Sequence, residues 1–184
     1  MEPRRHEASV PSNCSASLPD VLDACCGGKA FWFNKSDTRA TFMDIRSGEY
    51  PVNRTGRSPV TVQPDIVADF TAMPFPDNNF TLVVFDPPHF ETLGKTGTFA
   101  KTYGVLVAGW RETLQAGFAE CFRVLKPSGV LIFKWCEWEI PVKEVLALTP
   151  EKPLFGHISG KRAQTHWIAF MKPNADIRNG EPKM

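Results

Sequence analysis

The sequence predicts an α/β domain built on a doubly wound, mainly parallel sheet flanked by helices. Two observations lead to this prediction. The apolar runs are short, and several are continuous rather than alternating, which is typical of strands buried on both faces. Helical patterns lie between some of these runs, as the crossovers of a parallel sheet require. The 184 residues match the size of a single domain with its own core, and we find no internal repeat.

Six strand-sized apolar runs are spread along the chain. They cover residues 21–24, 40–45, 65–68, 82–85, 130–135 and 167–171. Residues 153–157 are a candidate for a further strand. Residues 1–19, rich in Ser, Pro and Arg, and residues 173–184 have no such pattern and predict a disordered arm and tail. The folded domain is therefore expected over residues 20–172.

The clearest helix is predicted over residues 110–125. Its apolar positions recur at helical spacing, namely Leu114, Phe118, Cys121, Phe122 and Leu125. The segment Lys126-Pro127-Ser128-Gly129 ends it. Shorter helices are predicted over residues 143–148 and after Gly28. Phe31-Trp32-Phe33 opens the second of these and is expected to pack into the core, with a contact to the ligand as the alternative.

The composition excludes several classes of protein. The formal net charge is +1, so a nucleic-acid partner must be met by a local basic patch rather than by a global field. No apolar run approaches the ~20 residues of a membrane span, and no secretory signal is present. Five cysteines, with no C-x-x-C pair, argue against a disulfide framework and a zinc site. We therefore expect a cytoplasmic protein without a metal.

Acidic residues follow four of the predicted strands, at the edge where doubly wound sheets bind their ligands. They are Asp23, Asp44, Asp69 and Asp86. A single aspartate at the end of a strand is usually a helix cap or a turn former. Four at corresponding positions favour a binding site.

The residues around three of these acids match the parts of a nucleoside. Small residues after Asp23 allow a ligand to approach the backbone closely. Asp44 can accept hydrogen bonds from both ribose hydroxyls. Asp69 can accept from an adenine amino group while Phe70 packs on the ring face. The candidate cofactor-binding residues are Asp23, Ala24, Cys25, Cys26, Gly27, Asp44, Ile45, Asp69, Phe70 and Asp86.

Phosphate-binding loops are not indicated by the sequence. The dinucleotide fingerprint G-x-G-x-x-G is absent, because the loop after Asp23 reads A-C-C-G-G-K-A. Gly94-Lys95-Thr96 resembles the end of a P-loop, but His89 stands where the first glycine is required. This glycine- and lysine-containing stretch is instead expected to form either a flexible basic loop over the target pocket or a merely disordered loop.

Asp86-Pro87-Pro88-His89 is the candidate catalytic segment. An exocyclic amine on a base is a poor nucleophile, because its lone pair is delocalised into the ring. The Asp86 carboxylate and the Pro87 carbonyl can both accept from its N–H groups and turn its lone pair outward, while Pro88 helps to stiffen the loop. His89 can stack on the base or take the released proton. Lys134 is open to three roles: binding a phosphate, pairing with an acid, or reaching into solvent.

Four segments together resemble class I S-adenosylmethionine-dependent methyltransferases. They are VLDACCGG, FMDIR, VADFTAMPFPDNNFTLVVFDPP and CFRVLKPSGVLIFKW, within a likeness that covers residues 21–172 and is strongest to short, single-domain enzymes of phage and prophage type. The resemblance implies a Rossmann-like fold with a seven-stranded sheet and S-adenosyl-L-methionine as cofactor. It places Asp23 and Gly27 at the methionine part, Asp44 at the ribose, and Asp69 with Phe70 at the adenine.

The D-P-P-H segment resembles the D/N-P-P-aromatic motif of amino-methyltransferases that act on bases flipped from the stack. In this chain His89 stands where the family has an aromatic residue, and Cys25 replaces the first glycine of the loop motif. The expected reaction is methyl transfer to an exocyclic amine of a nucleic-acid base, with adenine in DNA as first choice and RNA as second. The alternatives are a small-molecule or protein-amine methyltransferase and a non-catalytic cofactor-binding protein.

Several parts of the chain are candidates for binding a nucleic acid. The basic loop carries Lys95 and Lys101, and a second candidate is a basic edge composed of His157, Lys161, Arg162, His166 and Lys172. A dimer or a partner protein is the remaining source of sequence specificity.

Overall fold

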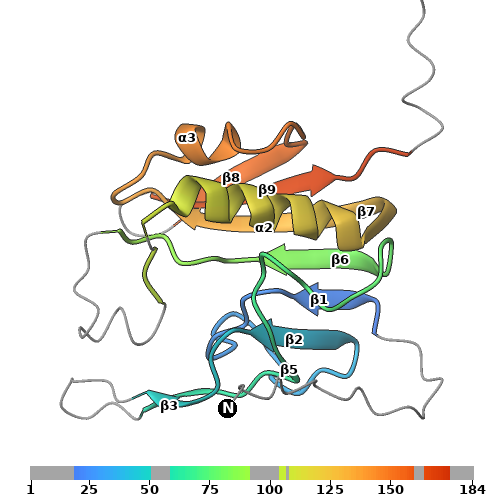
Figure 1. Ribbon diagram of the computed structural model, residues 1–184, viewed down its shortest axis with the longest axis vertical. Coiled ribbons are helices and arrows are strands. Elements are labelled where there is room, and N and C mark those ends of the chain that lie inside the picture. The colour runs from blue at the N-terminus through green and yellow to red at the C-terminus, as the bar shows by residue number, and fades with distance from the viewer. Residues whose placement is uncertain (1–18, 51–58, 92–103, 107, 160–163, 175–184) are drawn as a thin grey trace, which may run out of the picture.

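The computed structural model describes residues 19–50, 59–91, 104–106, 108–159 and 164–174. Its strands form a seven-stranded sheet in the order β5-β2-β1-β6-β7-β9-β8 and a separate two-stranded sheet, β3-β4 (Figure 1). The strands are β1 Val21–Asp23, β2 Ala40–Asp44, β3 Gly48–Tyr50, β4 Val60–Val62, β5 Ile66–Val67, β6 Phe80–Phe85, β7 Leu125–Cys136, β8 Phe155–Ser159 and β9 Thr165–Met171. The helices described are α2, Trp110–Val124, and α3, Val142–Leu146.

The large sheet is mainly parallel, as the sequence predicts. The pairs β5–β2, β2–β1, β1–β6 and β6–β7 are parallel, whereas β9 runs antiparallel to both β7 and β8. The chain proceeds from β1 outward through β2 to β5 and then returns to β6 on the other side of β1. The strand order therefore reverses between β1 and β6, and ligands of such sheets bind outside the carboxyl ends of the strands at this point.

The predicted helix after Gly28 is wrong. Residues 28–38 form turns, and Lys29 has the left-handed φ of 54°, which cannot begin a right-handed helix. Trp32 packs its ring against Phe42 of β2, with the centroids 4.8 Å apart, while the Phe33 side chain is fully exposed rather than in the core. Contacts of Trp32 with the sheet, which no helical pattern reveals, hold this segment in place.

The start of β7 also differs from the prediction. The strand was expected from Val130, but Lys126-Pro127-Ser128-Gly129, which follows the end of the helix as predicted, lies within the bounds of β7. The pairing of β6 with β7 shifts register there, from Phe80 opposite Leu125 to Leu82 opposite Val130. A bulge of this kind accommodates extra residues while the strand continues. The β3–β4 hairpin was not predicted either, because its strands are too short to show a pattern.

Helix α2 covers one face of the sheet around β6 and β7 (Figure 1). Leu114, Phe118 and Cys121 are essentially inaccessible to solvent, and the Phe118 ring lies 5.6 Å from Phe85 and 5.0 Å from Phe133. Burying each such large apolar side chain contributes about 1.5–3 kcal/mol. This packing anchors β6, which ends at the predicted catalytic segment.

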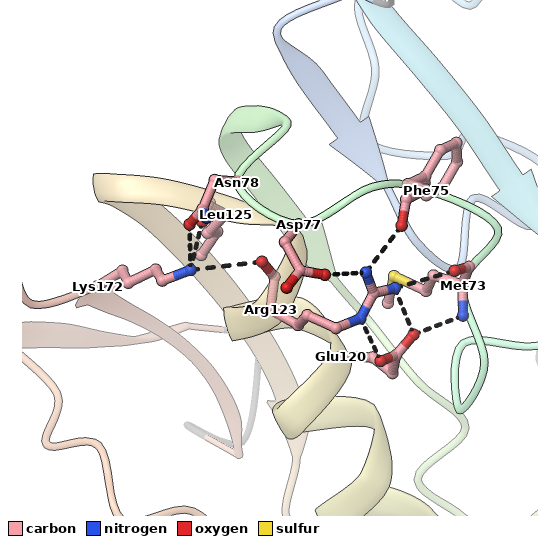
Figure 2. A network of polar contacts seen from close by, with 8 residues as sticks. All are labelled: Met73, Phe75, Asp77, Asn78, Glu120, Arg123, Leu125 and Lys172. Carbon is pink, nitrogen blue, oxygen red and sulfur yellow. Dashed lines mark hydrogen bonds and ion pairs between the residues drawn. The ribbon is translucent and has the colours of Figure 1, made fainter.

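A polar network fastens the C-terminal end of α2 to the turn before β6 (Figure 2). The Arg123 guanidinium donates to the carbonyl oxygens of Met73 and Phe75 at 3.0 and 2.8 Å and pairs with Asp77 and Glu120. Lys172 donates to the carbonyl oxygen of Leu125 at 2.6 Å and to Asn78 at 2.8 Å. Lys172, predicted as part of a basic edge, therefore satisfies backbone carbonyls near the end of the helix.

Other sequence predictions fall outside the described residues or on part of them. Almost all of the predicted arm and tail lies outside, as do Lys95, Lys101, Lys161 and Arg162. None of the helices in the described ranges is long and apolar enough to span a bilayer. Within the same ranges, no three His, Cys, Asp or Glu side chains are grouped as ligands for a metal ion would be.

Candidate active site

Two adjoining pockets open where the strand order reverses. The smaller, of about 340 Å³, is lined by Asp69 and is called here the Asp69 pocket. The larger, of about 680 Å³, is lined by Lys29 and is called the Lys29 pocket. Three side chains, those of Cys25, Arg46 and Asp86, line both pockets. The pockets are therefore two parts of one site.

Most of the predicted cofactor-binding residues lie in the Asp69 pocket. They are Ala24, Cys25, Asp44, Ile45, Asp69, Phe70 and Asp86. Cys26 and Gly27 line the Lys29 pocket instead. Burial raises the pKa of the Cys26 thiol to about 12, so this side chain is a neutral, small wall and not a nucleophile.

Asp44 lies at the end of β2 and receives four hydrogen bonds. Gly27 donates its backbone N–H to Oδ2 at 2.8 Å, and Arg46 donates its backbone N–H to Oδ1 at 2.9 Å. The Arg46 guanidinium adds Nε to Oδ1 at 3.0 Å and Nη2 to Oδ2 at 3.3 Å. Gly27 adopts a φ of 48°, which glycine reaches without strain. A ligand that uses Asp44 must compete with the arginine.

The remaining walls of the Asp69 pocket combine acceptors with apolar surface. Asp69 Oδ1 accepts from the backbone N–H of Thr71 at 2.9 Å and from its hydroxyl at 2.8 Å, so one oxygen supports a turn. The Phe70 ring packs edge-on to Phe85 at 5.3 Å. Ile45 leaves 60% of its surface exposed. The pocket suits a flat, partly apolar ligand that carries hydroxyl and amino groups.

Asp23 lines neither pocket, in contrast to its expected contact with the ligand. It is wholly buried, and its carboxylate accepts from Trp32 Nε1 at 2.6 Å and from the backbone N–H of Cys25 at 3.3 Å. Burial raises the pKa of Asp23 to about 7, with the nearby Asp86 and Asp44 adding to the shift. Asp23 therefore holds the loop that forms the pockets.

Asp86 and Lys134 form an ion pair at the boundary of the two pockets. Because Phe85 of β6 is opposite Phe133 of β7, the next residue of each strand brings the two charges together. Lys134 Nζ lies 2.6 Å from Asp86 Oδ2 and 5.7 Å from the ring centroids of both Phe31 and Trp167. Asp86 Oδ1 is buried and has no hydrogen-bond partner among the described residues. A buried carboxylate oxygen in this state requires a donor, which a ligand can supply.

The rest of the D-P-P-H segment divides between the pockets. Pro87 and His89 line the Lys29 pocket, and Pro88 lines the Asp69 pocket. Gly104, at a φ of 79°, lies so close to Pro88 that an added Cβ would be 2.9 Å from its Cγ. Only glycine at position 104 therefore allows the segment 104–106 to approach Pro88 this closely.

The His89 ring packs against other aromatic rings of the protein. Its centroid lies 4.4 Å from that of Phe90 and 5.9 Å from that of Trp135. Burial lowers the pKa of His89, and the negative charge of Asp86 opposes this shift. The imidazole is therefore neutral at pH 7 and able to accept a proton.

Sequence reasoning missed two partners of the predicted acids. Arg46 stands two residues after Asp44 in "FMDIR", a spacing that allows both side chains to lie at one sheet edge. Trp32 reaches Asp23 across a loop, and no local signal indicates that contact. Lys134 was left open between three roles, and it pairs with an acid.

Comparison with solved structures shows the class of fold. No protein-family model and no curated protein sequence matches the chain. A SAM-dependent methyltransferase from Methanosarcina mazei matches with a TM-score of 0.52 at 13% identity, over 85% of this chain and 93% of that one. A protein of Pyrococcus horikoshii matches with a TM-score of 0.53 at 18% identity, over 84% and 81% of the two chains.

A third structure, the N-methyltransferase NodS from Bradyrhizobium japonicum, matches with a TM-score of 0.51 at 15% identity, over 86% of this chain and 88% of that one. At these identities the similarity concerns the fold. The chain has the Rossmann-like fold of class I S-adenosylmethionine-dependent methyltransferases.

Proposed function

We propose that the protein is an S-adenosylmethionine-dependent methyltransferase that methylates an exocyclic amino group of a nucleic-acid base. The observation that carries this proposal is the position of Asp86. It lines both pockets, and its Oδ1 is buried without a partner among the described residues. A methyl donor in one pocket and an amine in the other would meet at this carboxylate.

The Asp69 pocket fits the nucleoside part of the cofactor. Asp44 offers its carboxylate to ribose hydroxyls, and Asp69 has a second oxygen for an adenine amino group. Ile45 and Phe70 supply apolar surface for the ring. S-adenosylmethionine would supply a methyl group bound to a positively charged sulfur, and the neutral thioether that remains after transfer is an excellent leaving group.

The residues of the D-P-P-H segment would prepare the amine. Asp86 Oδ1 and the Pro87 carbonyl accept from its N–H groups and so direct its lone pair, which is catalysis by positioning. Lys134 holds the other Asp86 oxygen in place. His89, neutral at pH 7, has a ring nitrogen that can take the proton lost by the methylated amine.

Adenine in DNA is the first candidate for the target base and RNA the second, on the basis of the D-P-P segment. A small-molecule amine is the alternative. It is favoured by the size of the Lys29 pocket, because about 680 Å³ lies in the range of sites for small ligands.

Two experiments test the proposal. Calorimetry with S-adenosylhomocysteine tests the cofactor, and the absence of measurable binding would rule out the methyltransferase.

Transfer of a labelled methyl group into separated DNA, RNA and metabolite pools tests the substrate. We expect label in nucleic acid with the wild type and its loss in Asp86→Asn, while Lys152→Gln, at an exposed lysine outside both pockets, serves as the matched control. Label only in the metabolite pool would contradict the nucleic-acid assignment. Cofactor binding with unchanged biological function in Asp86→Ala would indicate a non-catalytic protein.

A further inference from the structure

The charged residues that line the Lys29 pocket are mainly cations. Lys29, Lys35, Arg46 and Lys134 contribute side chains to its wall, whereas Asp86 is the one acid among its lining residues in the described part of the chain. Asp86 is already paired with Lys134 at 2.6 Å. The whole chain carries a net charge of only +1, so the positive charge here is local. A pocket of this kind concentrates anions.

The turns between Gly28 and β2 place both Lys29 and Lys35 among the residues that line the pocket. Lys29 Nζ donates to the carbonyl oxygen of Lys35 at 3.0 Å and lies 3.8 Å from the centroid of the Phe42 ring. These contacts fix the base of the turn. The Lys35 side chain itself makes no hydrogen bond or ion pair with the other described residues. Its charge is therefore available to a ligand.

Arg46 connects this cationic wall with the Asp69 pocket. Asp44 accepts four hydrogen bonds, two of them from the Arg46 guanidinium, and a carboxylate has about four acceptor positions. Hydroxyl groups that bind to Asp44 must therefore displace the guanidinium. Because Arg46 also lines the Lys29 pocket, the displaced group is close to any anion bound there.

We infer that the Lys29 pocket contains a phosphate subsite formed by Lys35, Lys29 and Arg46, which binds the phosphate attached to the nucleoside of the target base. This inference rests on the proposed function and adds the group by which the substrate is held. A guanidinium with neighbouring ammonium groups is a common arrangement for phosphate recognition. The phosphate belongs either to a free nucleotide or to a nucleic-acid strand. This subsite differs from the basic loop and the basic edge that the sequence suggested.

The first test compares ligands with and without the phosphate on protein saturated with S-adenosylhomocysteine, so that the Asp69 pocket is closed to them. We expect adenosine 5′-monophosphate to bind more tightly than adenosine. In Lys35→Gln, the ratio of the two affinities should fall about tenfold. Lys152→Gln is the matched control and should leave it unchanged. Equal binding of the two ligands, or an undiminished preference in Lys35→Gln, would overturn the inference.

The source of the phosphate is identified with a short single-stranded oligodeoxynucleotide. Tighter binding of the oligonucleotide than of the mononucleotide would assign the subsite to a strand, and equal binding would assign it to a free nucleotide. For a strand, Lys35→Gln should also reduce the slope of log affinity against log salt by about 0.7, the contribution of one phosphate contact.

A second comparison separates the substrate phosphate from the carboxylate of the cofactor. S-adenosylhomocysteine carries that carboxylate, and 5′-methylthioadenosine lacks it. We expect Lys35→Gln to leave the affinities for both unchanged. A loss confined to S-adenosylhomocysteine would assign the lysine to the cofactor and overturn the subsite. Failure of S-adenosylhomocysteine to bind the wild type would instead contradict the proposed function itself.

The shared arginine predicts coupling between the two pockets. In the wild type, the mononucleotide should tighten the binding of S-adenosylhomocysteine several-fold, since each ligand favours the displaced Arg46. Arg46→Gln should abolish this effect while the protein still binds S-adenosylhomocysteine. Coupling that persists in Arg46→Gln would show that the arginine is not part of the subsite.

Discussion

Lys134 Nζ lies 2.6 Å from Asp86 Oδ2; Asp86 directly follows β6, and Lys134 lies within the neighbouring parallel strand β7. The pair leaves Asp86 Oδ1 as the free acceptor at the boundary of the two pockets. An ammonium group at Oδ2 restrains the rotation of the carboxylate. The direction in which Oδ1 accepts is thus set by a residue 48 positions further along the chain.

Replacement of Lys134 should therefore affect turnover more than binding. We expect Lys134→Met to lower kcat about tenfold or more, equivalent to ~1.4 kcal/mol in the activation barrier, with little change in the KM for the cofactor. Lys134→Arg should restore part of kcat, because a guanidinium can also donate to Oδ2. Steady-state kinetics of the three proteins measure this. Equal losses in both variants would argue against a role in orienting Asp86.

His89 should determine the acid side of the pH–rate profile. Burial lowers its pKa below the usual value of 6.5, so the neutral, proton-accepting form is lost only as the pH falls below that value. We expect kcat/KM to decrease there as the imidazolium forms. His89→Phe should keep the ring packing but remove this limb and lower the rate at neutral pH. An unchanged limb in this variant would assign it to another group.

Asp23 should make the protein less stable as the pH rises. Its pKa is about 7 in the folded protein against 3.8 as the reference, so between these values the native state binds more protons than the unfolded chain. The free energy of unfolding therefore falls with increasing pH across this window. The fall is about 1.4 kcal/mol for each unit by which the pKa is raised. Denaturant unfolding at pH 4 to 8 should show this fall in the wild type and a flatter curve in Asp23→Asn.

A second variant checks the cause of that pH dependence. Trp32 donates to Asp23 at 2.6 Å, and this hydrogen bond lowers the pKa of the carboxyl group. Trp32→Phe should raise the pKa further, so the fall in stability should continue to higher pH. A curve identical to that of the wild type would show that the hydrogen bond has no influence on the titration.

Gly117 of α2 allows Phe70 to reach the wall of the Asp69 pocket. A Cβ at this position would be 2.7 Å from Phe70 Cδ2 and 2.8 Å from Phe85 Cζ. We expect Gly117→Ala to destabilise the protein by about 1–3 kcal/mol, despite the better helix propensity of alanine, and to weaken binding of S-adenosylhomocysteine. Gln115→Ala, at an exposed position of the same helix, should be neutral or slightly stabilising. Thermal unfolding and calorimetry measure both effects.

Much of the fold and part of the candidate site were predictable from local patterns. Continuous apolar runs indicated the strands, and the periodicity around Phe118 indicated α2 to within a residue. Because the carboxyl ends of parallel strands meet at one edge, the acids after β2, β5 and β6 were expected to converge, and Asp44, Asp69 and Asp86 line a common pocket.

The pairing of side chains depended on tertiary structure, because it follows from strand order and from the path of the loops. Lys134 meets Asp86 only because β7 lies beside β6, and Trp32 meets Asp23 only because the segment after Gly28 folds back without forming a helix. The same folding places Lys29 and Lys35 at the pocket that Arg46 also lines. Periodicity describes which face of an element is buried, whereas the partners that hold each carboxylate and the charge of the larger pocket are properties of segments distant in the chain.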